Sequence, residues 1–111
     1  MEISYSTKKN VIIIHLTGLF EYHDETKVSN LINERIREKP SAIAIDLTGV
    51  DTINSSGVAA LLSILKAADE NRIDFVLYGM NPKVLMLLEK VFSRDFVPLL
   101  TEEEFTERYL R

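Results

Sequence analysis

The sequence predicts an α/β fold, a single domain spanning residues 1–111 with a small mixed β-sheet and helices packed on it. The length of 111 residues suits one domain. Strand-length apolar segments alternate along the chain with segments whose apolar residues recur at helical spacing. Strands joined by single helices pair in parallel through right-handed crossovers. The predicted element order is therefore β-β-α-β-α-β-α-(β)-α.

The chain begins with a predicted antiparallel hairpin. Ile3 and Tyr5 alternate with polar residues, which indicates a half-buried first strand. Residues 7–10 form a turn, and the β-branched run at residues 11–16 predicts a more buried second strand. Gly18 is expected to end it.

A helix and a third strand follow the hairpin. Asp24 is expected to cap the helix, and Pro40 stops it because the residue before proline disfavours the α region. The apolar stripe of this helix comprises Val28, Leu31, Ile32 and Ile36. Residues 42–47 are apolar up to Asp46 and predict a third strand.

The second predicted helix starts near Ser55 and is followed by a strand at residues 73–78. Its predicted core stripe comprises Val58, Leu61, Leu62, Leu65 and Ala68. Asn71 suits the left-handed position at the carboxyl end of this helix.

Asn81 followed by Pro82 signals the start of a third helix. The residues expected to face inward are Val84, Leu85, Leu88, Val91 and Phe92. Residues 96–97 are predicted as a short edge strand ended by Pro98.

A last helix begins with a capping box, in which Thr101 precedes Glu104 by three residues. Phe105 and Tyr109 are expected to dock this helix on the body of the domain.

Composition excludes several kinds of function. Thirteen basic against seventeen acidic residues give a net charge of −4, which argues against a nucleic-acid partner. Without cysteine, and with only His15 and His23 as isolated histidines, the sequence predicts no metal site and no cofactor. The amino-terminus lacks signal-peptide features, and no apolar stretch approaches the about 20 residues that span a bilayer. We therefore expect a cytoplasmic protein without direct membrane insertion.

The motifs that mark common enzyme classes are absent, so no catalytic residue and no enzymatic activity are expected. The sequence contains no phosphate-binding glycine loop, no dinucleotide fingerprint and no nucleophile elbow. Ser55, His15 and Asp46 are the residues from which a small serine hydrolase could be built, and this is kept as a distant alternative.

The most informative segment is the junction at residues 46–58, where a buried strand runs through a loop into a helix that opens with two serines and a glycine. In the simplest interpretation, Asn54 or Ser55 caps the helix. Hydroxyl groups at a helix amino-terminus also suit phosphorylation, because free N–H groups and the helix dipole stabilise the added charge. Gly57, without a side chain, would let the backbone of another protein approach closely.

This junction, from Ile45 to Val58, resembles the signature of STAS domains, specifically the stand-alone anti-sigma factor antagonists of bacteria. Two further segments resemble the same family: the sequence from Leu16 to Gly18 followed by Glu21, and the helix start at residues 81–84. The three motifs occur in the family's order, and the resemblance extends over nearly the whole chain.

The resemblance implies a binding protein that regulates transcription without catalysis. Such proteins bind an anti-sigma factor, which is also a serine kinase, and thereby release a sigma factor. Phosphorylation by the kinase ends the interaction, and a serine phosphatase restores it. Ser55 matches the phosphorylated serine, with Ser56 as the second choice. The implied partner-binding residues are Glu21, His23, Asn54, Ser55, Ser56, Gly57 and Val58. We expect a monomer or a weak dimer.

One position departs from the family pattern. Asn54 stands where the family usually has aspartate, so the cap is kept and a negative charge is lost. This departure favours an alternative, in which the same fold serves as a constitutive adaptor subunit that docks on a larger complex such as a lipid transporter.

Overall fold

Residues 1–21 and 23–111, which the computed structural model describes, form five strands and four helices. The elements are β1 (Glu2–Lys8), β2 (Val11–Thr17), α1 (Asp24–Ile36), β3 (Ala42–Gly49), α2 (Ser55–Glu70), β4 (Asp74–Tyr78), α3 (Pro82–Val91), β5 (Leu99–Leu100) and α4 (Glu102–Tyr109). The strands lie in the sheet in chain order, and β1 is antiparallel to β2 while β2 to β5 are parallel. The predicted mixed α/β fold is confirmed.

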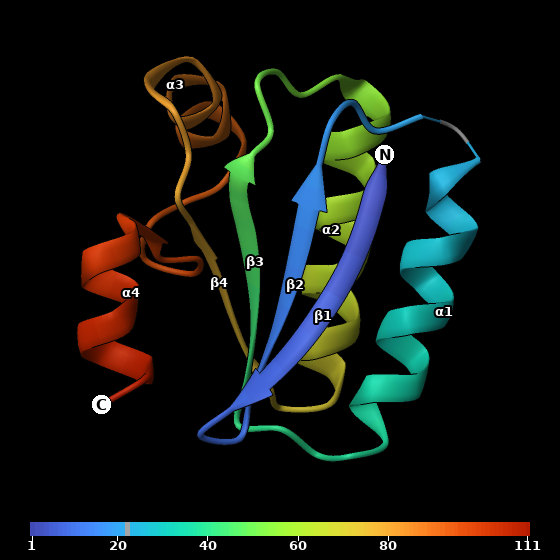
Figure 1. The fold of residues 1–111 in the computed structure, drawn as a ribbon, viewed down its shortest axis with the longest axis vertical. Coiled ribbons are helices and arrows are strands. Elements are labelled where there is room, and N and C mark those ends of the chain that lie inside the picture. Colours follow the sequence, from blue (N-terminus) through green and yellow to red (C-terminus); the bar gives the residue numbers. More distant parts are fainter. Residues whose placement is uncertain (22) are drawn as a thin grey trace.

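Helices cover the two faces of the sheet unequally (Figure 1). The larger core lies between the sheet and the helices α1, α2 and α3, and includes Ile14, Ile45 and Leu77 from three neighbouring strands. A smaller core lies on the opposite face, where α4 packs Phe105 against Tyr78 with ring centroids 4.1 Å apart. The same face also carries Ser6 of β1 and His15 of β2, whose side chains lie 2.9 Å apart.

The predicted hairpin is confirmed, but its turn is shorter than the predicted turn at residues 7–10, because Thr7 and Lys8 pair with β2 as part of β1. Lys9 and Asn10 have φ angles of 54° and 63°, the left-handed conformation required by a two-residue turn between antiparallel strands. Tyr5 is 44% exposed, more than the expected half-buried strand implies, because β1 is an edge strand. The guanidinium of Arg35 lies 4.6 Å from the Tyr5 ring centre and donates a 2.6 Å hydrogen bond to its hydroxyl.

Asp24 does not cap α1, contrary to the sequence prediction. It is the first helical residue, and the preceding His23 makes no capping hydrogen bond. The Asp24 side chain turns back and accepts a 2.8 Å hydrogen bond from the backbone N–H of Glu21. It therefore stabilises the loop before the helix.

The predicted orientation of α2 is wrong in part. Leu62 is 44% exposed, while Ala60 and Ile64, outside the predicted stripe, are buried with Leu61 and Ala68. A helix with apolar residues on most of its circumference has no unique inward face, and packing on the sheet selects one. At its carboxyl end the left-handed residue is Arg72, with φ of 58°, and not Asn71.

The predicted edge strand at residues 96–97 is also wrong. Phe96 is 84% exposed, and the strand that pairs with β4 is β5, which follows Pro98. The carbonyl of Pro98 accepts the N–H of Leu77, so the proline leads into the strand instead of ending it. On α3, Val91 was expected to face inward and is 38% exposed, whereas Val84, Leu88 and Phe92 are buried.

The capping box of α4 is confirmed: Thr101 accepts from the N–H of Glu104, and the Glu104 carboxylate accepts from the N–H of Thr101. No helix in the described part of the chain has the length and apolar character needed to cross a membrane.

Candidate functional site

The carboxyl end of the sheet brings together two of the loops singled out from the sequence. The loop after β2 carries Phe20 and Glu21, and the loop after β3 leads into α2. Asn54 connects them, because its side-chain Nδ2 donates a 2.8 Å hydrogen bond to the carbonyl of Phe20. Its Oδ1 accepts a 2.8 Å hydrogen bond from the N–H of Gly57 and so caps α2. The sequence predicted the cap but not the bridge to Phe20.

Asn81 makes an equivalent connection on the other side of the β3–α2 loop. Its Oδ1 caps α3 by accepting from the N–H of Val84 at 2.8 Å. Its Nδ2 donates to the carbonyls of Val50 and Asp51 at 3.3 and 3.0 Å. The β3–α2 loop is therefore held from both ends by asparagine side chains, each of which also starts a helix.

Gly57 has an internal packing role that the sequence did not predict. A Cβ atom placed on it would lie 2.7 Å from Cγ1 of Ile53 and 3.4 Å from Cβ of Phe20. Gly57 is buried, so the space that its missing side chain leaves is filled from within the protein. This close contact sets the position of Ile53 beneath the first turn of α2.

Ser55 and Ser56 open α2 directly after the cap. Ser55 is exposed and Ser56 is partly exposed. Asn54 accepts the N–H groups of both Gly57 and Val58, through its side chain and its carbonyl. Within the described residues, the backbone N–H groups of Ser55 and Ser56 have no hydrogen-bond acceptor. The first turn also contains no acidic residue, so the positive end of the helix dipole is not offset there.

Glu21 and His23 lie in the neighbouring loop and are both exposed, with their side chains 3.5 Å apart. The buried carboxylate of Asp24 holds this loop by accepting the Glu21 N–H. That hydrogen bond, more than the opposing effect of burial, lowers the pKa of Asp24 below its ordinary value. The structure therefore brings Glu21 and the Ser55 turn close through Phe20 and Asn54, while His23 extends the same loop.

The alternative catalytic grouping of Ser55, His15 and Asp46 is not formed. His15 does bind Asp46, with 2.7 Å between Nδ1 and Oδ2. Its other ring nitrogen, Nε2, lies 2.9 Å from the hydroxyl of Ser6 on β1, not from Ser55. Ser6 was not predicted as a partner of His15, because the register of the hairpin was not known from the sequence. In the structure the turn at residues 9–10 places residues 4 and 6 on the same face of the hairpin as His15.

The contacts among Ser6, His15 and Asp46 connect β1, β2 and β3 on the face of the sheet that α4 covers in part. Asp46 Oδ1 accepts hydrogen bonds from the N–H and the hydroxyl of Thr48 at 2.9 and 2.7 Å. Burial raises the pKa of Asp46, but the hydrogen bonds from Thr48 and His15 outweigh it, and the pKa lies below its ordinary value. The carboxylate is thus held in its charged form.

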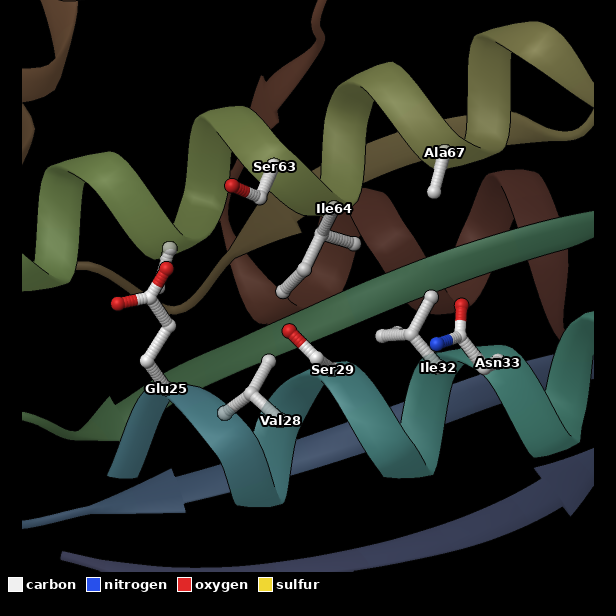
Figure 2. Close-up of a pocket in the computed structure, with 9 residues that line it drawn as sticks. Glu25, Val28, Ser29, Ile32, Asn33, Ser63, Ile64 and Ala67 are labelled. Atoms are coloured by element: carbon white, nitrogen blue, oxygen red, sulfur yellow. The ribbon is translucent and has the colours of Figure 1, made fainter. Parts of the chain in front are cut away.

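A groove lies between α1 and α2, away from the Ser55 turn, with a volume of about 90 Å³. Figure 2 shows Val28, Ile32 and Ile64 between the two helices, and Glu25 extending from α1 toward α2. None of the predicted site residues lines it. Among residues 1–21 and 23–111, no three or more His, Cys, Asp or Glu side chains are grouped so as to hold a metal ion.

Comparison with known proteins identifies a matching family model and a relative that is similar over part of its length. A family model described as "STAS domain" matches residues 2–105. The chain is 33% identical over 95 residues to the probable sulfate transporter 3.5 of Arabidopsis thaliana, a match that covers 83% of this chain and 14% of the transporter. This chain therefore corresponds to a small part of that relative.

Two solved structures illustrate the fold. A putative anti-sigma factor antagonist from Thermotoga maritima has a TM-score of 0.83 at 20% identity, covering 98% of this chain and 95% of that one. The Bacillus cell fate determinant SpoIIAA in its phosphorylated form has a TM-score of 0.75 at 17% identity, covering 96% and 98%. At these identities the likeness establishes a shared fold.

Proposed function

The chain belongs to the STAS domain family, and we propose that it is an anti-sigma factor antagonist switched off by phosphorylation of Ser55. In its unmodified form it binds an anti-sigma factor that is also a serine kinase. A serine phosphatase removes the phosphate and restores binding. The exposed position of Ser55 at the start of α2, next to the loop of Glu21 and His23, is the observation that supports this proposal most directly.

The local structure favours Ser55 as the modified residue over Ser56 or any interior hydroxyl. Ser55 follows the cap, and within the described residues the N–H groups of Ser55 and Ser56 have no hydrogen-bond acceptor. A phosphate there gains hydrogen bonds from these donors and a favourable interaction with the helix dipole. Modification therefore leaves the fold intact while it changes the surface.

The same phosphate opposes binding. A partner surface shaped for a neutral hydroxyl can neither pair nor solvate a dianion, and an uncompensated charge at an interface costs about 3–4 kcal/mol. That loss weakens affinity by about two to three decades. The carboxylate of Glu21, in the adjacent loop, and the phosphate would both repel any acidic group that the partner presents.

The partner-binding surface proposed here combines the two connected loops. Glu21 and His23 supply charge and hydrogen-bonding groups on one side, and Ser55, Ser56 and Val58 form the first turn of α2 on the other. Asn54 and Gly57 act mainly from within, since they fix how the two loops sit together. Asn54 serves this purpose better than aspartate, because a carboxylate has no hydrogen to donate to the Phe20 carbonyl.

Isolation of the protein from its native cells tests this proposal. We expect a serine kinase to co-purify and peptide mass spectrometry to find phosphate on Ser55. Ser55→Asp should weaken binding to that kinase by about two decades or more, whereas Ser63→Asp, an exposed serine on the same helix, should bind as wild type does. Equal binding of Ser55→Asp and wild type would overturn the switch.

A second candidate function is a constitutive adaptor that docks on a larger membrane complex. The match to a segment of a probable sulfate transporter supports it, although that match covers 14% of the transporter. In this case Ser55 stays unmodified under several growth conditions and a transporter co-purifies in place of a kinase.

A further inference from the structure

We propose that the outer edge of β1 is a self-association surface at which two copies of the chain pair in antiparallel register about Tyr5. The inference is independent of the function proposed for Ser55. β1 is one edge of the sheet and runs for seven residues. It lies in the foreground of Figure 1, and no other element crosses in front of it. The opposite edge strand, β5, has only two residues and leads directly into α4.

The β1 edge lacks the features that usually prevent strands from pairing with other chains. Proteins protect such edges with proline, bulges or charged residues in the middle of the strand. β1 contains no proline, pairs with β2 without a register shift from Glu2 to Lys8, and carries charge only at those two end residues. Its outward backbone groups are therefore available to a second strand.

The hairpin determines which backbone groups point outward. The two-residue turn closes on Lys8 and Val11 as a hydrogen-bonded pair, so the N–H and C=O groups of Lys8 face β2. Because the direction alternates along a strand, the N–H and C=O groups of Ile3, Tyr5 and Thr7 face away from the sheet.

A single register satisfies all of these groups. When Tyr5 lies opposite Tyr5 of the second copy, Ile3 lies opposite Thr7 of that copy, and every outward N–H and C=O from residues 3, 5 and 7 is paired. The same register places Glu2 opposite Lys8 of the second copy, once at each end of the paired strands. A shift of two residues in either direction loses both opposite-charge pairs. Charge complementarity therefore selects a second copy of the chain as the occupant of this edge.

The side chains around the two-fold axis are compatible with this pairing. Glu2 and Lys8 form no ion pair within the described residues. Arg35, which covers the Tyr5 ring, forms ion pairs with Glu34 and Glu38 at 3.5 and 3.2 Å, so its charge does not stand unpaired beside the β1 edge. One strand pair buries a small area, so we expect a weak dimer.

Charge reversal at both ends of β1 tests the register, with the dimer dissociation constant measured by sedimentation equilibrium up to the highest soluble concentration. Glu2→Lys and Lys8→Glu alone should each weaken association about tenfold, because like charges then face each other twice. The double variant Glu2→Lys/Lys8→Glu should restore the wild-type constant. The controls Glu103→Lys and Lys66→Glu make the same charge changes at exposed positions outside β1 and should leave it unchanged.

A backbone variant provides a second test. Thr7→Pro removes an outward N–H without removing a bond to β2, so far-ultraviolet circular dichroism should show a folded protein while association is lost. A wild-type chain that stays monomeric at all concentrations would overturn the proposal. So would a double charge variant as weak as the single variants, or a folded Thr7→Pro variant that associates like wild type.

Discussion

The side-chain amide of Asn54 donates to the carbonyl of Phe20 at 2.8 Å, and this contact joins the two loops of the candidate site. Because the same side chain accepts the N–H of Gly57, both of its polar atoms have partners and the orientation of the amide is determined. The turn that carries Ser55 and the loop that carries Glu21 therefore form one connected unit.

Replacements of Asn54 should distinguish the stability contributed by the cap on Gly57 from that contributed by the hydrogen bond to Phe20. Asn54→Asp keeps an acceptor for Gly57 but places a carboxylate beside the Phe20 carbonyl, so we expect a loss of about 1–2 kcal/mol in the free energy of unfolding. Asn54→Ala removes both contacts and should cost at least as much. Urea denaturation measures both variants. Asn71→Ala, at the exposed carboxyl end of α2, is the matched control. An Asn54→Asp variant as stable as wild type would show that the hydrogen bond to Phe20 contributes nothing to stability.

Gly57→Ala should destabilise the protein by about 1–2 kcal/mol, although alanine is a better helix former than glycine. The added Cβ would lie 2.7 Å from Cγ1 of Ile53, and overpacking of this kind outweighs the gain in helix propensity. Ile53→Ala should relieve the clash, so the double variant should lose less stability than the sum of the two single variants. Additive losses in a double-mutant cycle would contradict the packing role.

Asp46 should make stability depend on pH in the acidic range. Its pKa is lower in the folded protein than its ordinary value, so its contribution is fully present above that ordinary value, about 4, and is lost as the pH falls through the folded pKa. We expect Asp46→Asn to be less stable than wild type by about 1–2 kcal/mol at pH 7, and the difference to shrink at pH 3. Urea denaturation at both pH values measures it, with Asp95→Asn as a control for the change in net charge. A difference that stays constant would exclude this linkage.

Replacement by alanine of two phenylalanines near the carboxyl end should change the stability of the protein by very different amounts. Phe105 is buried and stacked on Tyr78, so Phe105→Ala should cost about 3–5 kcal/mol and release α4 from the sheet. Phe96 is 84% exposed, and Phe96→Ala should change stability by no more than about 0.5 kcal/mol. Thermal or urea denaturation compares the two directly. Similar losses for both would show that the packing of α4 contributes little.

The sequence alone was sufficient to predict the fold class, the order of the elements and the family, and the family match confirms the resemblance. These features are encoded locally. The cap at Asn81 with Pro82, the capping box at Thr101 and the alternation in the hairpin each depend on residues within about four positions of one another. Helix starts and strand runs can therefore be recognised without knowledge of distant contacts.

Only the tertiary structure decided which residues meet across the chain. The Asn54 bridge to Phe20 spans 34 positions, the His15 contact with Asp46 spans 31, and Gly57 is small because Ile53 and Phe20 fill the space beside it. Leu62 and Phe96 are as apolar as Ile64 and Leu99, so the sequence alone does not distinguish them. Leu62 and Phe96 are exposed because only one face of each segment can pack on the sheet, and that face carries Ile64 and Leu99. Local sequence specifies which segments become helices and strands, whereas the packing of those segments on one sheet selects the faces that are buried and the polar groups that pair.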